Sequence, residues 1–113
     1  MFDDQPKEIE LYDEDAFNKW RKALPQMARR KLDTRLTRLE AGNPGPPETG
    51  WKTLGEGVYE LKIHEGVGYR VYFAFSGKHI ILLLCGGAKP AQDADIVRAK
   101  KLWAEWQKRG QPE

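Results

Sequence analysis

The fold is decided by residues 58–64, which read Val-Tyr-Glu-Leu-Lys-Ile-His. Apolar and polar side chains alternate along this stretch: the apolar set is Tyr59, Leu61 and Ile63, and the polar set is Glu60, Lys62 and His64. Successive side chains of a β-strand point to opposite faces of its sheet. The pattern therefore predicts a strand with one face in the core and one polar face.

The same alternation continues after a turn at residues 65–68. The apolar face of this second predicted strand holds Tyr69, Val71, Phe73 and Phe75, and its other face holds Arg70, Tyr72 and Ala74. A tight turn at residues 76–78 leads into residues 79–85, whose nearly continuous apolar sequence is typical of a strand covered on both sides. We therefore expect three consecutive antiparallel strands.

The register of the first two strands follows from their apolar faces. If those faces lie on the same side of the sheet, the numbers of paired residues must sum to an even value. A sum near 134 places His64 opposite Arg70 and Lys62 opposite Tyr72. Because cross-strand neighbours lie about 5 Å apart, these four residues would form one cationic, hydrogen-bonding patch on a sheet face that is otherwise free.

The N-terminal half predicts a short strand and two helices. Residues 8–12 form the strand, and Asp13 can cap the helix that follows. Pro25 ends this helix and fits the first turn of a second one, whose apolar residues are Ala28, Leu32, Leu36 and Leu39. Residues 42–50 contain three prolines and three glycines, which predicts a loop.

A last helix completes the expected architecture. Asp93 can cap it, and its apolar stripe consists of Ile96, Ala99, Trp103 and Trp106. We predict a single domain over residues 1–113 of the α+β class, with the order β-α-α-β-β-β-α. A curved antiparallel sheet carries the helical hairpin on one face, and the chain closes with the C-terminal helix.

Composition excludes several classes of protein. The longest apolar run is Ile80 to Cys85, six residues, whereas a membrane-spanning helix needs roughly 20. No apolar block follows Met1, so no secretion signal is expected. Cys85 is the only cysteine, which excludes an internal disulfide and fits a reducing cytoplasm. We expect a cytoplasmic protein with no cofactor and no bound metal.

Charge is unevenly distributed although the net charge is only +2. Residues 1–15 carry seven acidic residues and one lysine, whereas residues 17–40 carry eight bases and two acidic residues. A folded surface that clusters bases attracts polyanions or acidic proteins. The alternative is a helix face that is simply well solvated.

The side chains of the predicted patch could cleave RNA. Such a reaction needs a base for the ribose 2′-OH, cations for the scissile phosphate and an acid for the leaving 5′ oxygen. Arg70 suits the phosphate because its guanidinium is planar and always charged, and His64 could transfer protons near neutral pH. Lys62 could act as a base only if crowded by other cations, and otherwise binds phosphate. Alternatively these are ordinary exposed residues, with Glu60 paired to a cation.

Three ordered blocks of the sequence resemble a known family. They are residues 57–63 (GVYELKI), 68–73 (GYRVYF) and 82–96 (LLLCGGAKPAQDADI). Together with Phe17, Trp20 and the arginine-rich second helix, they resemble the phage-derived, HigB-like branch of the RelE/ParE toxin superfamily. The resemblance covers nearly the whole chain.

The resemblance implies a RelE-like fold and the toxin of a type II toxin–antitoxin system. RelE-like toxins cut mRNA in the ribosomal A site, so the implied activity is a metal-independent endoribonuclease that inhibits translation. The implied partners are a cognate antitoxin protein, the ribosome and mRNA, with no membrane and no small-molecule cofactor.

Individual positions carry this comparison further. Arg70 matches the family's Gly-Tyr-Arg arginine, and Lys62 matches a basic position on the preceding strand. Glu60 stands where a second strand lysine is expected, which weakens the case for a lysine base. The C-terminal Arg and Tyr of the best-studied branch have no clear match, and this chain offers Lys89 and Gln92 in that region. The expected catalytic residues are Arg70, Lys62, His64 and Lys89. The expected RNA-binding residues are Arg29, Arg30, Arg35, Arg38, Tyr72 and Gln92.

Two other functions fit the same resemblance. ParE-like members share the fold but bind DNA gyrase and block replication without cleaving RNA. A degenerate toxin would only bind its antitoxin. Substitutions on the sheet face should abolish toxicity of an endoribonuclease, whereas substitutions on the helical hairpin should do so for a gyrase inhibitor.

Overall fold

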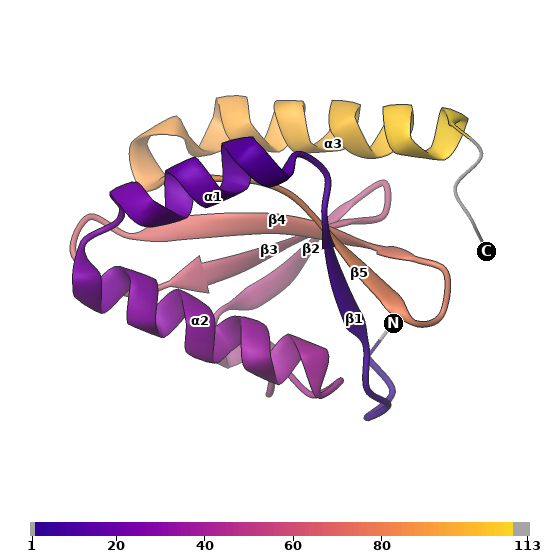
Figure 1. The fold of residues 1–113 in the computed structure, drawn as a ribbon, viewed down its shortest axis with the longest axis horizontal. Coiled ribbons are helices and arrows are strands. Elements are labelled where there is room, and N and C mark those ends of the chain that lie inside the picture. The colour runs from indigo at the N-terminus through magenta and orange to yellow at the C-terminus, as the bar shows by residue number, and fades with distance from the viewer. Residues whose placement is uncertain (1, 110–113) are drawn as a thin grey trace.

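The computed structural model describes residues 2–109, which form a five-stranded sheet with three helices (Figure 1). This confirms the α+β class. The elements are β1 (Glu8–Leu11), α1 (Glu14–Ala23), α2 (Gln26–Glu40), η1 (Pro47–Thr49), β2 (Trp51–Gly55), β3 (Val58–Ile63), β4 (Tyr69–Ser76), β5 (Ile80–Ala88), η2 (Lys89–Ala91) and α3 (Gln92–Lys108).

The sheet has the strand order β1-β5-β4-β3-β2. The pairs β2–β3, β3–β4 and β4–β5 are antiparallel, but β1 pairs in parallel with β5, so the prediction of an antiparallel sheet is wrong for this one pair. A parallel pair needs a long connection, and here everything from α1 to β4 lies between the two strands.

β2 was not predicted. It is a short edge strand whose central residues Lys52 and Thr53 are exposed, so it lacks an apolar periodicity.

The register of β3 and β4 differs from the expected one by two residues. Tyr59 pairs with Phe73 and Ile63 with Tyr69, so the paired numbers sum to 132. The even sum is confirmed, but Lys62 lies opposite Arg70, not opposite Tyr72. The physical reason is the turn over residues 64–68, which begins earlier than expected and takes His64 out of the ladder.

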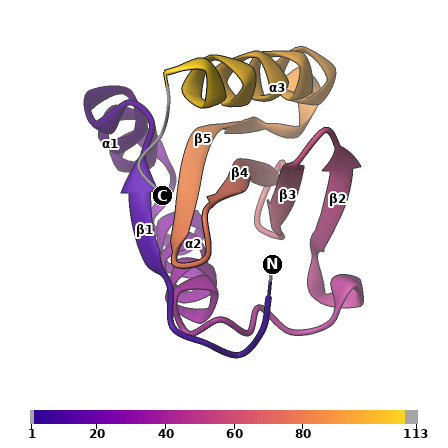
Figure 2. The same cartoon turned by 90° about the vertical axis from the view of Figure 1, so that its right-hand side faces the viewer.

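One face of the sheet is covered by the predicted helical hairpin (Figures 1 and 2). Asp13 caps α1 as expected, because its carboxylate accepts a hydrogen bond from the backbone N of Ala16 at 3.0 Å. Pro25 separates the helices and precedes the first residue of α2. Buried side chains of both helices meet those of the sheet in one core: Phe17, Leu24, Ala28, Leu32, Leu39, Leu61, Ile63, Val71, Phe73, Ile81 and Leu83.

The opposite face is covered by α3, so the prediction that it is free is wrong (Figure 2). The physical reason is that β4 and β5 also present apolar residues on this side, and α3 supplies a matching stripe. The buried residues of this second core are Val58, Tyr72, Ala74, Leu82, Leu84, Cys85, Ala99 and Trp103. α3 begins at Gln92 after Ala91, and no side chain caps it, so Asp93 lies in the first turn and is not the cap. Within residues 2–109, no helix combines the length and apolar character needed to cross a membrane.

Two adjacent glycines of β5 allow helices to approach both faces closely. A Cβ on Gly86 would lie 2.6 Å from the ring of Trp20 in α1, and one on Gly87 would lie 1.9 Å from Oδ2 of Asp95 in α3. Side chains at these positions would therefore push α1 or α3 away from the sheet.

We expect Gly86→Ala to lower the free energy of unfolding by about 1–3 kcal/mol, because the rigid indole of Trp20 has to move. Urea unfolding followed by circular dichroism measures this change. The double variant Gly86→Ala/Trp20→Leu should be less destabilised than the sum of the two single variants. Additive effects would contradict the close contact.

Candidate functional site

Four predicted catalytic residues line one surface depression. Lys62, His64, Arg70 and Lys89 surround it together with the turn over residues 65–68, and its volume is about 510 Å³. The structure thus brings together residues that are up to 27 positions apart in the chain. Three of the four are lysine or arginine, the side chains that most often bind anions in proteins, so the depression suits an anion.

Three segments of the chain position these side chains. Lys62 and Arg70 are direct partners on β3 and β4, which places them side by side at the open end of the sheet. His64 follows β3 and is exposed in the turn. The backbone N of Lys89 donates a hydrogen bond to the carbonyl of Gly68 at 3.0 Å, and this bond holds η2 against the turn.

Arg70 lies at the inner wall of the depression and is only 8% exposed. Its Nε is 3.5 Å from Oε1 of Glu60, whose side chain is completely buried. Glu60 is also approached by Lys52, with Nζ 4.0 Å from Oε2. One interpretation of the sequence expected Glu60 to pair with a cation on an exposed sheet face. Glu60 does pair with a cation, but its carboxylate is buried.

Gln92 contacts the same carboxylate. Its Nε2 donates a hydrogen bond to Oε1 of Glu60 at 2.8 Å, which links the first turn of α3 to β3. The amide donor of Gln92 is therefore directed at Glu60, although the sequence suggested that this residue faces RNA.

Tyr72 is not part of an open surface. Its side chain is fully buried beneath α3, so the expectation that it lies in an exposed patch and contacts RNA is wrong. Burial and, next, the charge of Glu60 raise the pKa of the Tyr72 hydroxyl well above its ordinary value. In this environment the hydroxyl is neither exposed to a ligand nor a ready proton donor.

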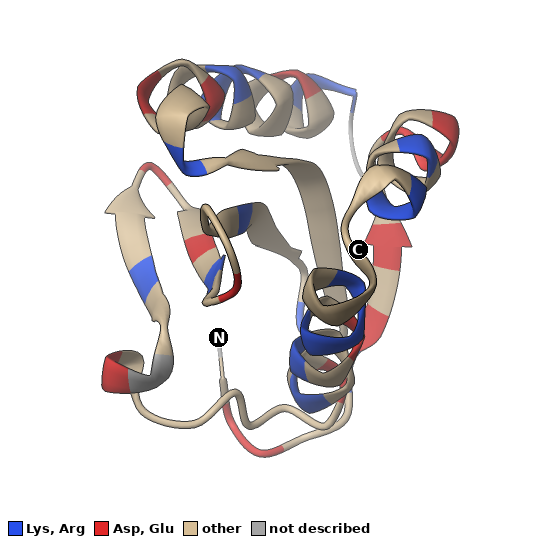
Figure 3. Ribbon diagram, turned by 90° about the vertical axis from the view of Figure 1, so that its left-hand side faces the viewer, with Lys and Arg blue, Asp and Glu red and all other residues tan. Residues whose placement is uncertain are grey.

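A second depression lies between α2 and the end of β3. It is lined by Arg30, Arg35 and Arg38 together with His64, and its volume is about 350 Å³. Figure 3 shows Lys and Arg along α2 and Asp and Glu along β1. Since His64 lines both depressions, they meet at this residue.

Two cations of α2 hold the end of β3 in place. Nη1 of Arg35 donates to the carbonyl of Lys62 at 3.2 Å, and Nζ of Lys31 donates to the carbonyl of His64 at 3.0 Å. Lys31 also pairs with Glu65 at 2.7 Å. Burial, followed by the charge of Arg38, lowers the pKa of Arg35. The sequence did not indicate this role, because Lys31 and Glu65 look like ordinary surface charges.

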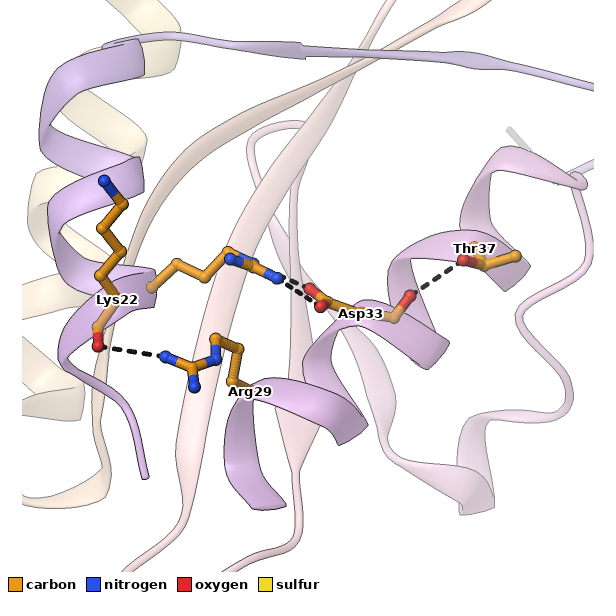
Figure 4. Close-up of polar contacts among 5 residues, drawn as sticks. Lys22, Arg29, Asp33 and Thr37 are labelled. Atoms are coloured by element: carbon orange, nitrogen blue, oxygen red, sulfur yellow. Dashed lines mark hydrogen bonds and ion pairs between the residues drawn. The ribbon is translucent and has the colours of Figure 1, made fainter. Parts of the chain in front are cut away.

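Arg29 lies apart from the other arginines of α2. Its Nη1 donates to the carbonyl of Lys22 in α1 at 3.3 Å (Figure 4). In the same interface, Arg21 of α1 donates two hydrogen bonds to the carboxylate of Asp33, one of them 2.9 Å long from Nε. These contacts join α1 to α2, so Arg29 does not line the depression formed by Arg30, Arg35 and Arg38.

Other reactive groups lie outside the site. Cys85 is buried between β5 and α3, and burial raises the pKa of its thiol to about 11. Among residues 2–109, no three His, Cys, Asp or Glu side chains are grouped so that they could hold a metal ion.

Comparison with known proteins identifies relatives of this chain. Residues 19–104 match the family described as phage-derived protein Gp49-like. The chain is 41% identical over 90 residues to an uncharacterized protein of Haemophilus influenzae, and the match covers 79% of this chain and 87% of that relative. The matched residues 19–104 include both depressions and the buried Glu60.

We expect Cys85 to react with a thiol reagent at pH 8 at least tenfold more slowly than free cysteine, because the thiolate is the reactive form. Its rate should keep rising as the pH approaches about 11. Colour release from a disulfide reagent, with the protein unfolded in urea as the control, measures both rates. Equal rates in the folded and unfolded protein would contradict the buried environment.

Proposed function

Because this chain belongs to the family of phage-derived Gp49-like proteins, we propose that it is the toxin of a type II toxin–antitoxin system and a ribosome-dependent mRNA endoribonuclease of the RelE/ParE superfamily. A cognate antitoxin protein would neutralise it. The observation that carries the proposal is the convergence of Lys62, His64, Arg70 and Lys89 on one depression. The α+β fold, with a helical hairpin against a five-stranded sheet, is compatible with a RelE-like architecture.

Arg70 is the proposed stabiliser of the reacting phosphate. Its Nε faces Glu60, while a Cβ on Gly68 would lie only 3.9 Å from its Nη1, which places that nitrogen at the wall of the depression. A guanidinium held in this way can donate hydrogen bonds to phosphate oxygens as negative charge develops on them.

His64 and the two lysines supply the other steps in this mechanism. His64 is exposed where the depressions meet, and it either accepts the proton of the attacking ribose 2′-OH or donates a proton to the leaving 5′ oxygen. Lys62 and Lys89 stand on different segments around the depression and bind the phosphates of the substrate strand. Cleavage then requires only acid–base catalysis and charge stabilisation by the protein.

The depression on α2 extends the proposed RNA-binding surface. Among the described residues, the side chains of Arg30 and Arg38 make no ion pair or hydrogen bond, so they are free to contact phosphates of ribosomal RNA or mRNA. Arg35 contributes positive charge while its Nη1 remains bonded to the carbonyl of Lys62.

We expect Arg70→Lys to reduce mRNA cleavage on the order of a hundredfold, because lysine keeps the charge but lacks the planar fork. Lysine is preferable to alanine, since a buried Glu60 without its cation would destabilise the fold by about 3–5 kcal/mol. The purified protein is added to a cell-free translation reaction and new mRNA 5′ ends are mapped. Lys78→Ala, which removes an exposed cation from the β4–β5 turn, is the matched control.

Two outcomes would contradict this assignment. If folded Arg70→Lys cleaves like the unmodified protein, Arg70 is not the phosphate stabiliser. If the unmodified protein leaves mRNA intact, the endoribonuclease proposal is wrong, and inhibition of DNA gyrase supercoiling becomes the function to assay.

The double variant Arg30→Gln/Arg38→Gln should bind ribosomes more weakly and with a shallower dependence on salt. Each lost phosphate contact reduces the slope of log affinity against log salt by about 0.7 for a single strand. Sedimentation of the protein with ribosomes at salt concentrations from about 50 mM to about 200 mM measures this slope. Arg29→Gln is the control, because Arg29 contacts α1 and does not line the depression on α2. An equal loss of ribosome affinity in that variant would contradict a specific role of this depression.

A further inference from the structure

We propose that Glu60 is a positioning residue, which holds Arg70 by its Nε edge so that the rest of the guanidinium faces the depression. This inference rests on the proposed function of Arg70 in RNA cleavage. Glu60 stands where the resemblance to the family led us to expect a lysine, and the structure assigns the carboxylate a place beneath the site instead of in it.

Glu60 contacts Arg70 from the buried side of the depression. Its side chain is fully buried, and Oε1 lies 3.5 Å from Nε of Arg70. Glu60 pairs with Tyr72 across the strands, so Arg70, two residues before Tyr72 on β4, is its diagonal neighbour on the same face. This spacing is within the reach of two long side chains.

Gln92 fixes the same carboxylate from the side of α3. Its Nε2 donates to the same Oε1 at 2.8 Å from the first turn of α3. The side chain of Glu60, which belongs to β3, is thus tied to the first turn of α3. A carboxylate locked by packing and by this hydrogen bond can hold its ion-pair partner in one orientation.

The buried charge of Glu60 requires a cation beside it. A buried carboxylate is strongly unfavourable without a cation beside it, and the cations near Glu60 are Arg70 and, at 4.0 Å, Lys52. The side chain of Lys52 is 50% exposed, whereas that of Arg70 is 10% exposed. Of the two cations, Arg70 is therefore the one whose side chain is buried and held in place beside Glu60.

The same carboxylate stabilises the cluster of cations above it. Lys62 and Arg70 are directly opposite each other on β3 and β4, and like charges in such positions repel. Glu60 offsets this repulsion from the buried side, so two cations can stand together at the wall of the depression. Without it, Arg70 would be free to turn away from Lys62.

Single-turnover cleavage by four proteins tests the proposal: the unmodified chain, Glu60→Gln, Arg70→Lys and the double variant. We expect Glu60→Gln to slow cleavage about tenfold with unchanged ribosome affinity, because the geometry at the reacting phosphate is lost but the cations remain. In the Arg70→Lys background the same change should have less than a twofold effect, since Glu60 acts through Arg70. An equal loss in both backgrounds would overturn the proposal.

Gln92→Met and Glu56→Gln complete the comparison. Gln92→Met removes the donor that orients Glu60 and should reproduce part of the loss, whereas Glu56→Gln removes an exposed carboxylate of the β2–β3 turn and should leave the rate unchanged. Thermal unfolding of each variant checks that it is folded. A normal rate in Gln92→Met together with a normal rate in Glu60→Gln would also overturn the proposal.

A readout that does not depend on cleavage separates this inference from the proposed function. The Nε–H group of Arg70 gives a nitrogen–proton NMR signal, assigned by its absence in Arg70→Lys. Its exchange with water should be at least tenfold faster in Glu60→Gln than in the unmodified chain. If the unmodified chain does not cleave RNA, the proposed function falls and this measurement decides the geometry alone. Equal exchange rates would show that Glu60 does not hold Arg70.

Discussion

The central strand β4 is covered on both faces, by α1 and α2 on one side and by α3 on the other, and the rest of the structure depends on this double burial. Gly86 and Gly87 of the neighbouring strand make it possible, because they let Trp20 and Asp95 approach opposite faces of the sheet. Polar groups that point into the second layer are then separated from water and depend on partners inside the protein. Arg70 and Glu60 form an ion pair there, whereas the Tyr72 hydroxyl has no hydrogen-bond partner in the part of the chain that the structure describes.

This burial also determines where a site can form. α3 covers the middle of its sheet face, so Lys62 and Arg70 can reach a ligand at the end of β3 and β4, where the turn over residues 64–68 meets η2. Hydrogen bonds hold this end in place: Arg35 and Lys31 of α2 donate to the carbonyls of Lys62 and His64, and the backbone N of Lys89 donates to the turn. A depression lined by cations on fixed backbone is well suited to bind an extended polyanion.

Local sequence patterns predicted much of this fold, whereas features that depend on contacts between distant segments were not predicted. The alternation in residues 58–64, the break at Pro25 and the cap at Asp13 depend on neighbouring residues and were confirmed. The buried positions of Glu60 and Tyr72 depend on α3, which lies 20 or more residues later in the chain, and were missed. The apolar run of β5 already indicated cover on both faces, and α3 provides it.

The basic segment over residues 17–40 shows why a count of charges does not identify a binding surface. Arg21 and Arg29 join α1 to α2, and Lys31 and Arg35 fasten α2 to the end of β3, so these cations have structural partners. A cation bonded within the protein gains less from a new phosphate, because it must give up or share its existing partner. In the described part of the chain, the side chains of Arg30 and Arg38 have no such partner, so they remain available to an anionic ligand at the depression on α2. The bonded cations determine where these two arginines stand.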